Sequence, residues 1–90
     1  MVESDLEIVN RLGLHARAAA KLVHLASAFT SRIELVTGDG EVIDAKSILG
    51  ILLLAASQGT SLKLRCDGPD ENEARTAITA LVADRFGEGE

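Results

Sequence analysis

The sequence predicts an α+β domain in which helices cover one face of a four-stranded sheet. Residues 61–66 alternate strictly between polar and apolar side chains, as a half-buried strand does. Residues 16–28 and 74–86 instead carry apolar side chains at helical spacing. The predicted order is strand, helix, strand, strand, helix, strand, helix. Because 90 residues suffice for one modest core, we expect a single domain over 1–90 whose tail, 87–90, frays.

The N-terminal part of the chain predicts a strand followed by a long helix. Leu6 and Ile8 alternate with Asp5 and Glu7, which indicates a strand up to about Val9. Ala, Leu, Arg and Lys then dominate residues 16–28, and these are strong helix formers. The helix residues expected to face the core are Ala19, Leu22, Val23 and Ala26. A second face, small and nearly uncharged, carries Ala16, Ala20, His24 and Ser27. That face is either a partner surface or ordinary solvated helix.

The middle of the chain predicts a hairpin and a short helix. Residues 32–37 and 41–44 read as antiparallel strands joined by the turn at 38–40. Ser47 is placed to cap a helix over 48–56, although that apolar run is also compatible with a buried strand. A short helix that is apolar nearly all round cannot bury every side. We therefore expect some of its large side chains to face solvent or a partner: Ile48, Leu49, Leu52 and Leu53.

The C-terminal part predicts one more strand and helix. Cys66 continues the apolar face of the strand at 61–66, so we expect a core thiol rather than a reactive one. Asp70 and Glu73 have the spacing of a capping box at the start of the last helix. The apolar stripe of that helix consists of Ala74, Ala77, Ile78, Leu81, Val82 and Phe86. Phe29 and Phe86 are the only aromatic residues available to the core.

Composition excludes several classes of function. A net charge of −5 without a basic cluster argues against nucleic-acid binding. A single cysteine cannot form an internal disulfide, which fits a reducing compartment. The acidic N-terminus does not resemble a signal peptide, and the longest apolar stretch is far shorter than the roughly 20 residues that span a bilayer. We expect a cytoplasmic monomer with no nucleic-acid or direct membrane contact.

His15 lies where a loop runs into the first helix. Gly13 provides backbone freedom for a turn, which places His15 at or near the N-cap. The first-turn amides of Ala16, Arg17 and Ala18 lack intrahelical acceptors and, with the Arg17 guanidinium, form a potential anion site. A neutral imidazole beside such a site suggests phosphoryl acceptance on His15. The alternative is a polar loop residue beside a solvated arginine.

The chain resembles the histidine-containing phosphocarrier proteins (HPr) of the bacterial phosphoenolpyruvate:sugar phosphotransferase system. The sequence Gly13-Leu14-His15-Ala16-Arg17 before an alanine-rich helix resembles their active-site signature. Residues 45–50 resemble the family's regulatory-serine segment around Ser47, and residues 56–60 the turn after its second helix. The resemblance covers essentially the whole chain. It implies an open-faced sandwich of βαββαβα order, with an antiparallel four-stranded sheet under three helices.

The resemblance also implies a function. His15 would accept a phosphoryl group from phospho-enzyme I, with Arg17 stabilising the phosphate, and pass it to an EIIA-type protein of a sugar or nitrogen-regulatory branch. The family uses the ring nitrogen Nδ1. The carrier needs no cofactor or metal of its own. The implied partner surface comprises Ala16, Ala20, His24, Ser27, Ile48, Leu49 and Leu52.

Two positions modify this expectation. Ser47 is a candidate for phosphorylation by an HPr kinase/phosphorylase, the alternative being a plain N-cap serine. Ala18 stands where the family usually has proline, and it restores an amide that we expect to act as a further donor to the phosphate or to the His15 ring.

Other functional classes remain open to different degrees. An HPr-like interaction module that docks regulators without carrying phosphate is the main alternative. His15, His24 and Cys66 show no recognised metal-ligand spacing. A serine or cysteine enzyme would need a base and an orienting carboxylate near its nucleophile, and the sequence offers no convincing set.

Overall fold

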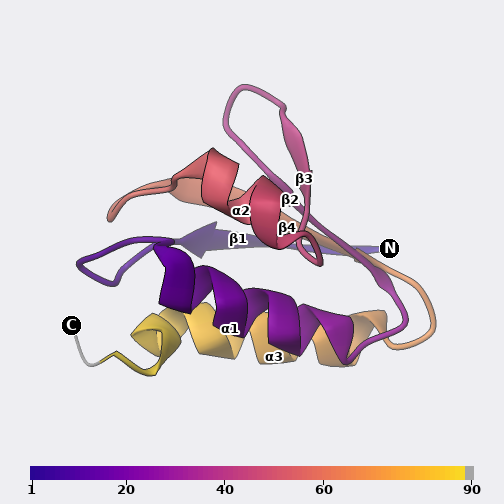
Figure 1. Cartoon of the computed structure of the whole chain (residues 1–90). Helices are drawn as coiled ribbons and strands as arrows, with labels where there is room; N and C mark the ends of the chain where they lie inside the picture. The colour runs from indigo at the N-terminus through magenta and orange to yellow at the C-terminus, as the bar shows by residue number, and fades with distance from the viewer. Residues whose placement is uncertain (89–90) are drawn as a thin grey trace.

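The computed structural model describes residues 1–88, which form a four-stranded sheet with three helices on one face (Figure 1). The order of elements is the predicted one, and the expected fold class is confirmed. In chain order the elements are β1 (Val2–Glu7), α1 (Ala16–Ser27), β2 (Arg32–Val36), β3 (Val42–Asp44), α2 (Ile48–Leu54), β4 (Ser61–Asp67), α3 (Glu71–Ala83) and the short 3-10 helix η1 (Arg85–Gly87).

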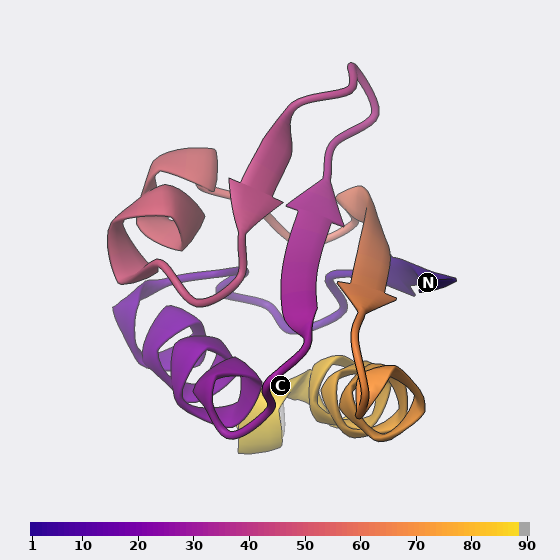
Figure 2. The same ribbon diagram turned by 90° about the vertical axis from the view of Figure 1, so that its right-hand side faces the viewer.

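The strands lie in the order β1-β4-β2-β3, and all three pairings are antiparallel. The predicted pairing of β2 with β3 is confirmed by the register of Leu35 with Ile43. β4 lies between β1 and β2, with Leu64 opposite Leu35. Figure 2 shows the sheet from a second direction, with the helices gathered on one side of it.

β1 begins and ends earlier than the alternation of Leu6 and Ile8 indicated. The strand starts at Val2 because β4 extends to Asp67, so that Cys66 faces Val2 across the sheet. Ile8 lies beyond the strand, yet its amide still donates to the carbonyl of Thr60 at 2.9 Å. The pairing therefore continues past the formal end of β1.

The core lies between the sheet and the helices. On α1, the expected core positions Ala19, Leu22 and Ala26 are buried, and Val23 is partly buried. Cys66 is fully buried, as expected, and burial raises the pKa of its thiol. The largest fully buried apolar side chains are Ile8, Leu22, Ile33, Leu35, Ile51, Leu64, Ile78 and Phe86.

The prediction of a capping box at the start of α3 is wrong. Asp70 is the N-cap residue, but its side chain makes no capping hydrogen bond. Its carboxylate instead accepts the amides of Thr30 and Ser31, each at 2.9 Å, and the Ser31 hydroxyl. Because the turn before β2 presents these donors, the carboxylate joins two segments 39 residues apart rather than its own helix.

The end of the chain also differs from expectation. Phe86 was expected on the helical stripe of α3, but the helix ends at Ala83 and Phe86 lies in η1. Arg85 and Phe86 both have left-handed backbone, at φ 56° and 55°, which turns the chain and brings Phe86 into the core. Gly87 and Glu88 were expected to fray, yet Gly87 closes η1 and the Glu88 side chain is hydrogen-bonded. The rest of the expected frayed tail, 89–90, lies outside the described residues.

Candidate functional site

His15 is the N-cap residue of α1, as the sequence predicted. Its backbone is extended, and its carbonyl accepts the Ala19 amide at 2.8 Å, so the first helical hydrogen bond begins here. The amide of Arg17 donates to Nδ1 of the ring, with 3.3 Å between the two nitrogens. The side chain is 28% exposed. The ring is therefore held against the helix start while remaining accessible.

The loop before His15 is fixed by Gly13 and Leu14. Gly13 has left-handed backbone at φ +66°, and a Cβ at this position would meet the Ala56 carbonyl oxygen at 2.5 Å. The buried Leu14 donates its amide to the same oxygen at 2.8 Å. Only glycine allows this approach, so the segment that follows α2 sets the position of His15.

The other ring nitrogen, Nε2, contacts the carboxylate of Glu88. The second Glu88 oxygen accepts a hydrogen bond of 2.8 Å from Nδ2 of Asn10, which is completely buried. Burial of Glu88 acts to raise the pKa of its carboxyl, but the hydrogen bonds from Asn10 and His15 and the nearby charges of His15 and Lys21 lower that pKa overall. Sequence reasoning missed the roles of Asn10 and Glu88. Glu88 lies 78 positions after Asn10 and 73 positions after His15, and no local sequence pattern connects residues so far apart.

The remaining predicted phosphate-binding residues lie in the first turn of α1. Ala16 and Arg17 are exposed, whereas Ala18 is fully buried. The first-turn amides of a helix have no intrahelical acceptors, so this end of α1 carries partial positive charge. The structure thus brings the His15 ring and the helix start together, as the sequence suggested.

The two predicted partner faces are exposed. On α1, this holds for the whole small face: Ala16, Ala20, His24 and Ser27. On α2, it holds for all four expected side chains: Ile48, Leu49, Leu52 and Leu53. Leu12, in the loop before His15, is 61% exposed and was not predicted. We call Leu12 together with the four α2 residues the apolar patch. The loop that carries Leu12 and His15 contacts the residues that directly follow α2.

Ser47 caps α2 as predicted. Its hydroxyl oxygen accepts the Gly50 amide at 3.1 Å, and the next residue, Ile48, belongs to the apolar patch. The helix ends at Leu54 instead of the expected residue 56, because Ala55 adopts left-handed backbone at φ 51°. Ser47 therefore has a structural role at the start of this helix.

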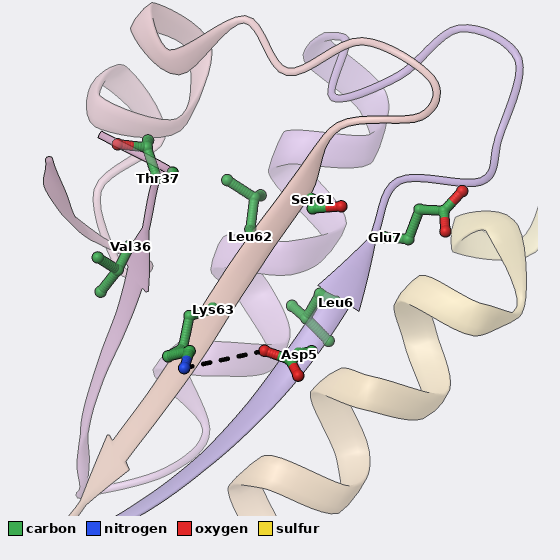
Figure 3. A pocket seen from close by; sticks show the side chains of 9 residues that line it. Asp5, Leu6, Glu7, Val36, Thr37, Ser61, Leu62 and Lys63 are labelled. Atoms are coloured by element: carbon green, nitrogen blue, oxygen red, sulfur yellow. Dashed lines mark ion pairs between the residues drawn. The ribbon is translucent and has the colours of Figure 1, made fainter. Parts of the chain in front are cut away.

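A surface hollow lies elsewhere, where β1 and β2 end and β4 begins (Figure 3). Asp5 and Lys63 approach to 4.0 Å there, and Asp5 is almost fully exposed, so this pair contributes little. None of the predicted site residues lines the hollow, whose lining is Asp5, Leu6, Glu7, Val36, Thr37, Gly38, Ser61, Leu62 and Lys63. We assign it no function.

Residues 1–88 lack two kinds of feature. No described helix is both long and apolar enough to cross a membrane. Among the same residues, histidine, cysteine, aspartate and glutamate side chains form no group of three or more that could hold a metal ion.

Fold and site together define a class of protein: a two-layer α+β domain that presents one histidine at the start of its first helix. A family model described as "PTS HPr component phosphorylation site" matches residues 2–84. The chain therefore belongs to the HPr family of phosphocarrier proteins. Its relatives in this family are phosphocarrier proteins.

Individual relatives agree over the full length. The phosphocarrier protein HPr of Cupriavidus necator is 52% identical over 90 residues, covering 100% of both chains. That of Xylella fastidiosa is 51% identical, covering 98% of both. A crystal structure of HPr from Thermoanaerobacter tengcongensis superposes with a TM-score of 0.93 at 45% identity, covering 98% of each chain. A crystal structure of an HPr dimer from the same organism superposes with a TM-score of 0.77 at 46% identity, covering 98% of this chain and 100% of the other.

Proposed function

We propose that His15 accepts a phosphoryl group from phospho-enzyme I of the phosphotransferase system and donates it to a histidine of an EIIA-type protein. The observation that carries the proposal is the place of the accessible His15 ring at the N-terminus of α1. In each transfer the incoming nitrogen forms a bond to phosphorus while the bond from phosphorus to the departing nitrogen breaks. The phosphoryl group therefore moves between imidazoles without hydrolysis.

The strength of the site suits a carrier. A helix N-terminus stabilises a nearby anion by about 0.3–1 kcal/mol at an exposed position. Every additional 1.4 kcal/mol would shift the transfer equilibrium about tenfold towards the phosphorylated carrier. The first-turn amides of Ala16, Arg17 and Ala18, with the exposed Arg17 side chain, can steady the phosphate without trapping it.

Partners would approach on the side that carries His15. The small exposed face of α1 permits close approach, and the apolar patch supplies area whose burial favours association. We assign this combined surface to enzyme I and EIIA, and we place the relay in the cytoplasm with the carrier acting as a monomer.

Ser47 is a second proposed phosphorylation site, for an HPr kinase/phosphorylase. A phosphate there would add about −2 charge beside Ile48, at the border of the apolar patch. It would be favourable at the N-terminus of α2, so we expect weaker docking of enzyme I rather than unfolding. Incubation with such a kinase followed by mass spectrometry tests this, and an unmodified Ser47 would refute it.

The decisive experiment mixes the protein with enzyme I and labelled phosphoenolpyruvate. We expect one acid-labile, base-stable phosphate per chain, lost in His15→Ala. His24→Ala is the control for the labelled residue, because it removes the other histidine and keeps His15. His24 lies on the proposed partner face, so labelling should be slower but should still reach one phosphate per chain. A protein that binds enzyme I but takes no label would instead be an interaction module.

A further inference from the structure

We propose that Glu88 is a positioning residue for His15, holding the Nε2–H of the ring so that Nδ1 faces the incoming phosphoryl group. The inference rests on the proposed function. It adds a residue that lies 73 positions along the chain from the histidine it orients.

The carboxylate of Glu88 is engaged at both oxygens. One contacts Nε2 of His15, and the other accepts the 2.8 Å hydrogen bond from Asn10. The same Asn10 nitrogen donates to the carbonyl of Gly13 at 2.7 Å, so it ties the carboxylate to the loop that sets His15. The Glu88 side chain is only 12% exposed. Its orientation is therefore determined by the site rather than by solvent.

The backbone that carries Glu88 is anchored separately. Phe86 is completely buried, and its carbonyl accepts a 2.6 Å hydrogen bond from Nζ of Lys21 on α1. The Glu88 amide donates to the carbonyl of Arg85 at 3.0 Å. The hydrogen bond from Lys21 therefore holds residues 86–88 against α1, and the Glu88 carboxylate lies at the start of that helix.

The two contacts of the ring select one tautomer. Nδ1 accepts the Arg17 amide, so it carries a lone pair and the hydrogen of the neutral ring lies on Nε2. That N–H can donate to the Glu88 carboxylate. Nδ1 is then the nitrogen that carries the electron pair for phosphorus, and the hydrogen bond from the Arg17 amide must break as the bond to phosphorus forms.

The carboxylate also acts on the charge that transfer creates. When Nδ1 forms its bond to phosphorus, the ring with its Nε2–H becomes positively charged, and the Glu88 carboxylate stabilises that charge. When the bond from Nδ1 to phosphorus breaks, the electron pair returns to Nδ1 and the ring is neutral again. No proton has to move in either direction.

The test compares the wild type with Glu88→Gln and Glu88→Ala. Glu73→Gln is the matched control, because it removes the same charge from an exposed position on α3. Proton NMR follows the Nε2–H of His15, and enzyme I with phosphoenolpyruvate gives the equilibrium constant for phosphoryl uptake. We expect a slowly exchanging Nε2–H in the wild type and in Glu73→Gln, and fast exchange in Glu88→Ala.

We also expect the equilibrium constant to fall about fivefold to tenfold in both Glu88 variants. Glu88→Ala removes the hydrogen bond to the charged ring, whereas Glu88→Gln keeps an acceptor but removes the negative charge that stabilises the ring. Unfolding in urea confirms that the variants are folded at the temperature used. A wild type that takes no phosphate overturns the proposed function and this inference with it. Normal phosphorylation of the wild type, with exchange and equilibrium constant unchanged in both Glu88 variants, overturns the inference alone.

Discussion

Gly13 shows how a single backbone position controls the site. Its left-handed backbone lets the chain pass against the carbonyl of Ala56, two residues before the histidine that we propose carries phosphate. A side chain would meet both the Ala56 oxygen at 2.5 Å and the Ser57 Cα at 2.9 Å, and both atoms belong to the backbone. The loop could relieve such contacts only by moving His15.

Gly13→Ala should therefore lower the free energy of unfolding by roughly 2 kcal/mol or more, since backbone strain and overlap act together. Urea unfolding measures the change. Gly40→Ala is the control, because Gly40 also has positive φ, +89°, but has nothing within 4 Å of the added Cβ. Equal losses in the two variants would show that the contact with Ala56 is unimportant.

Ala18 tests whether an amide contributes to the phosphorylated state. It is the third residue of α1, and it is fully buried. Ala18→Pro removes its amide hydrogen, which should shorten the lifetime of phosphorylated His15 if that amide steadies the phosphate. Loss of acid-labile label over time gives the lifetime. An unchanged lifetime in a folded variant would leave the extra amide without a role.

The individual residues also show what sequence reasoning can reach. His15 and Ser47 were identified as caps because the signal is local: a capping residue directly before a run of helix formers. Asn10 and Glu88 were missed because their partnership exists only after the chain has folded. The same reason explains the wrong prediction for Asp70. Its spacing to Glu73 suggested a local cap, but its carboxylate accepts hydrogen bonds from the amide and hydroxyl of Ser31, 39 positions earlier in the chain.

At the scale of elements, Asp70 joins the start of α3 to the turn before β2. Hydrogen bonds from the Ser31 hydroxyl, the Thr30 amide and the Ser31 amide lower the pKa of Asp70 to about 2, against an ordinary value of 3.8. Because the folded-state pKa is lower than the unfolded one, this carboxylate stabilises the fold above about pH 4. The stabilisation is lost as the pH falls towards 2.

Asp70→Asn should consequently be less stable than the wild type at neutral pH, and the difference should shrink between about pH 4 and pH 2. Urea unfolding across this range measures it. Below about pH 2 both side chains are neutral, so the two proteins should converge. A difference that stays constant with pH would mean that the charge of Asp70 is not responsible.

The α2 helix combines a local signal with a tertiary outcome. Its composition predicted that some large side chains would stay uncovered, and all four named ones are exposed. The sequence could not place them beside His15, because that depends on the contact of Gly13 and Leu14 with the end of this helix. The exposed Leu12 completes the apolar patch for the same reason.

For the molecule as a whole, a substitution in the apolar patch should impair phosphoryl transfer without lowering the stability of the fold. Leu53 is 76% exposed, so Leu53→Gln should change the free energy of unfolding by no more than about 0.5 kcal/mol. Phosphoryl transfer from enzyme I should nevertheless slow several-fold, because the docking area is reduced. Initial rates at low carrier concentration measure this effect. Val42→Thr, at an exposed apolar position on β3, is the control, and an equal slowing there would argue against a specific docking surface.

The strand order has a consequence for biosynthesis. β4 lies between β1 and β2, so two of the three strand pairings require residues 61–67. A nascent chain that has left the ribosome only as far as α2 can close the β2–β3 hairpin and coil α1, but β1 still has no neighbour. Interrupted translation products would thus expose β1 and the inner edge of β2, and quality-control proteases should remove them quickly.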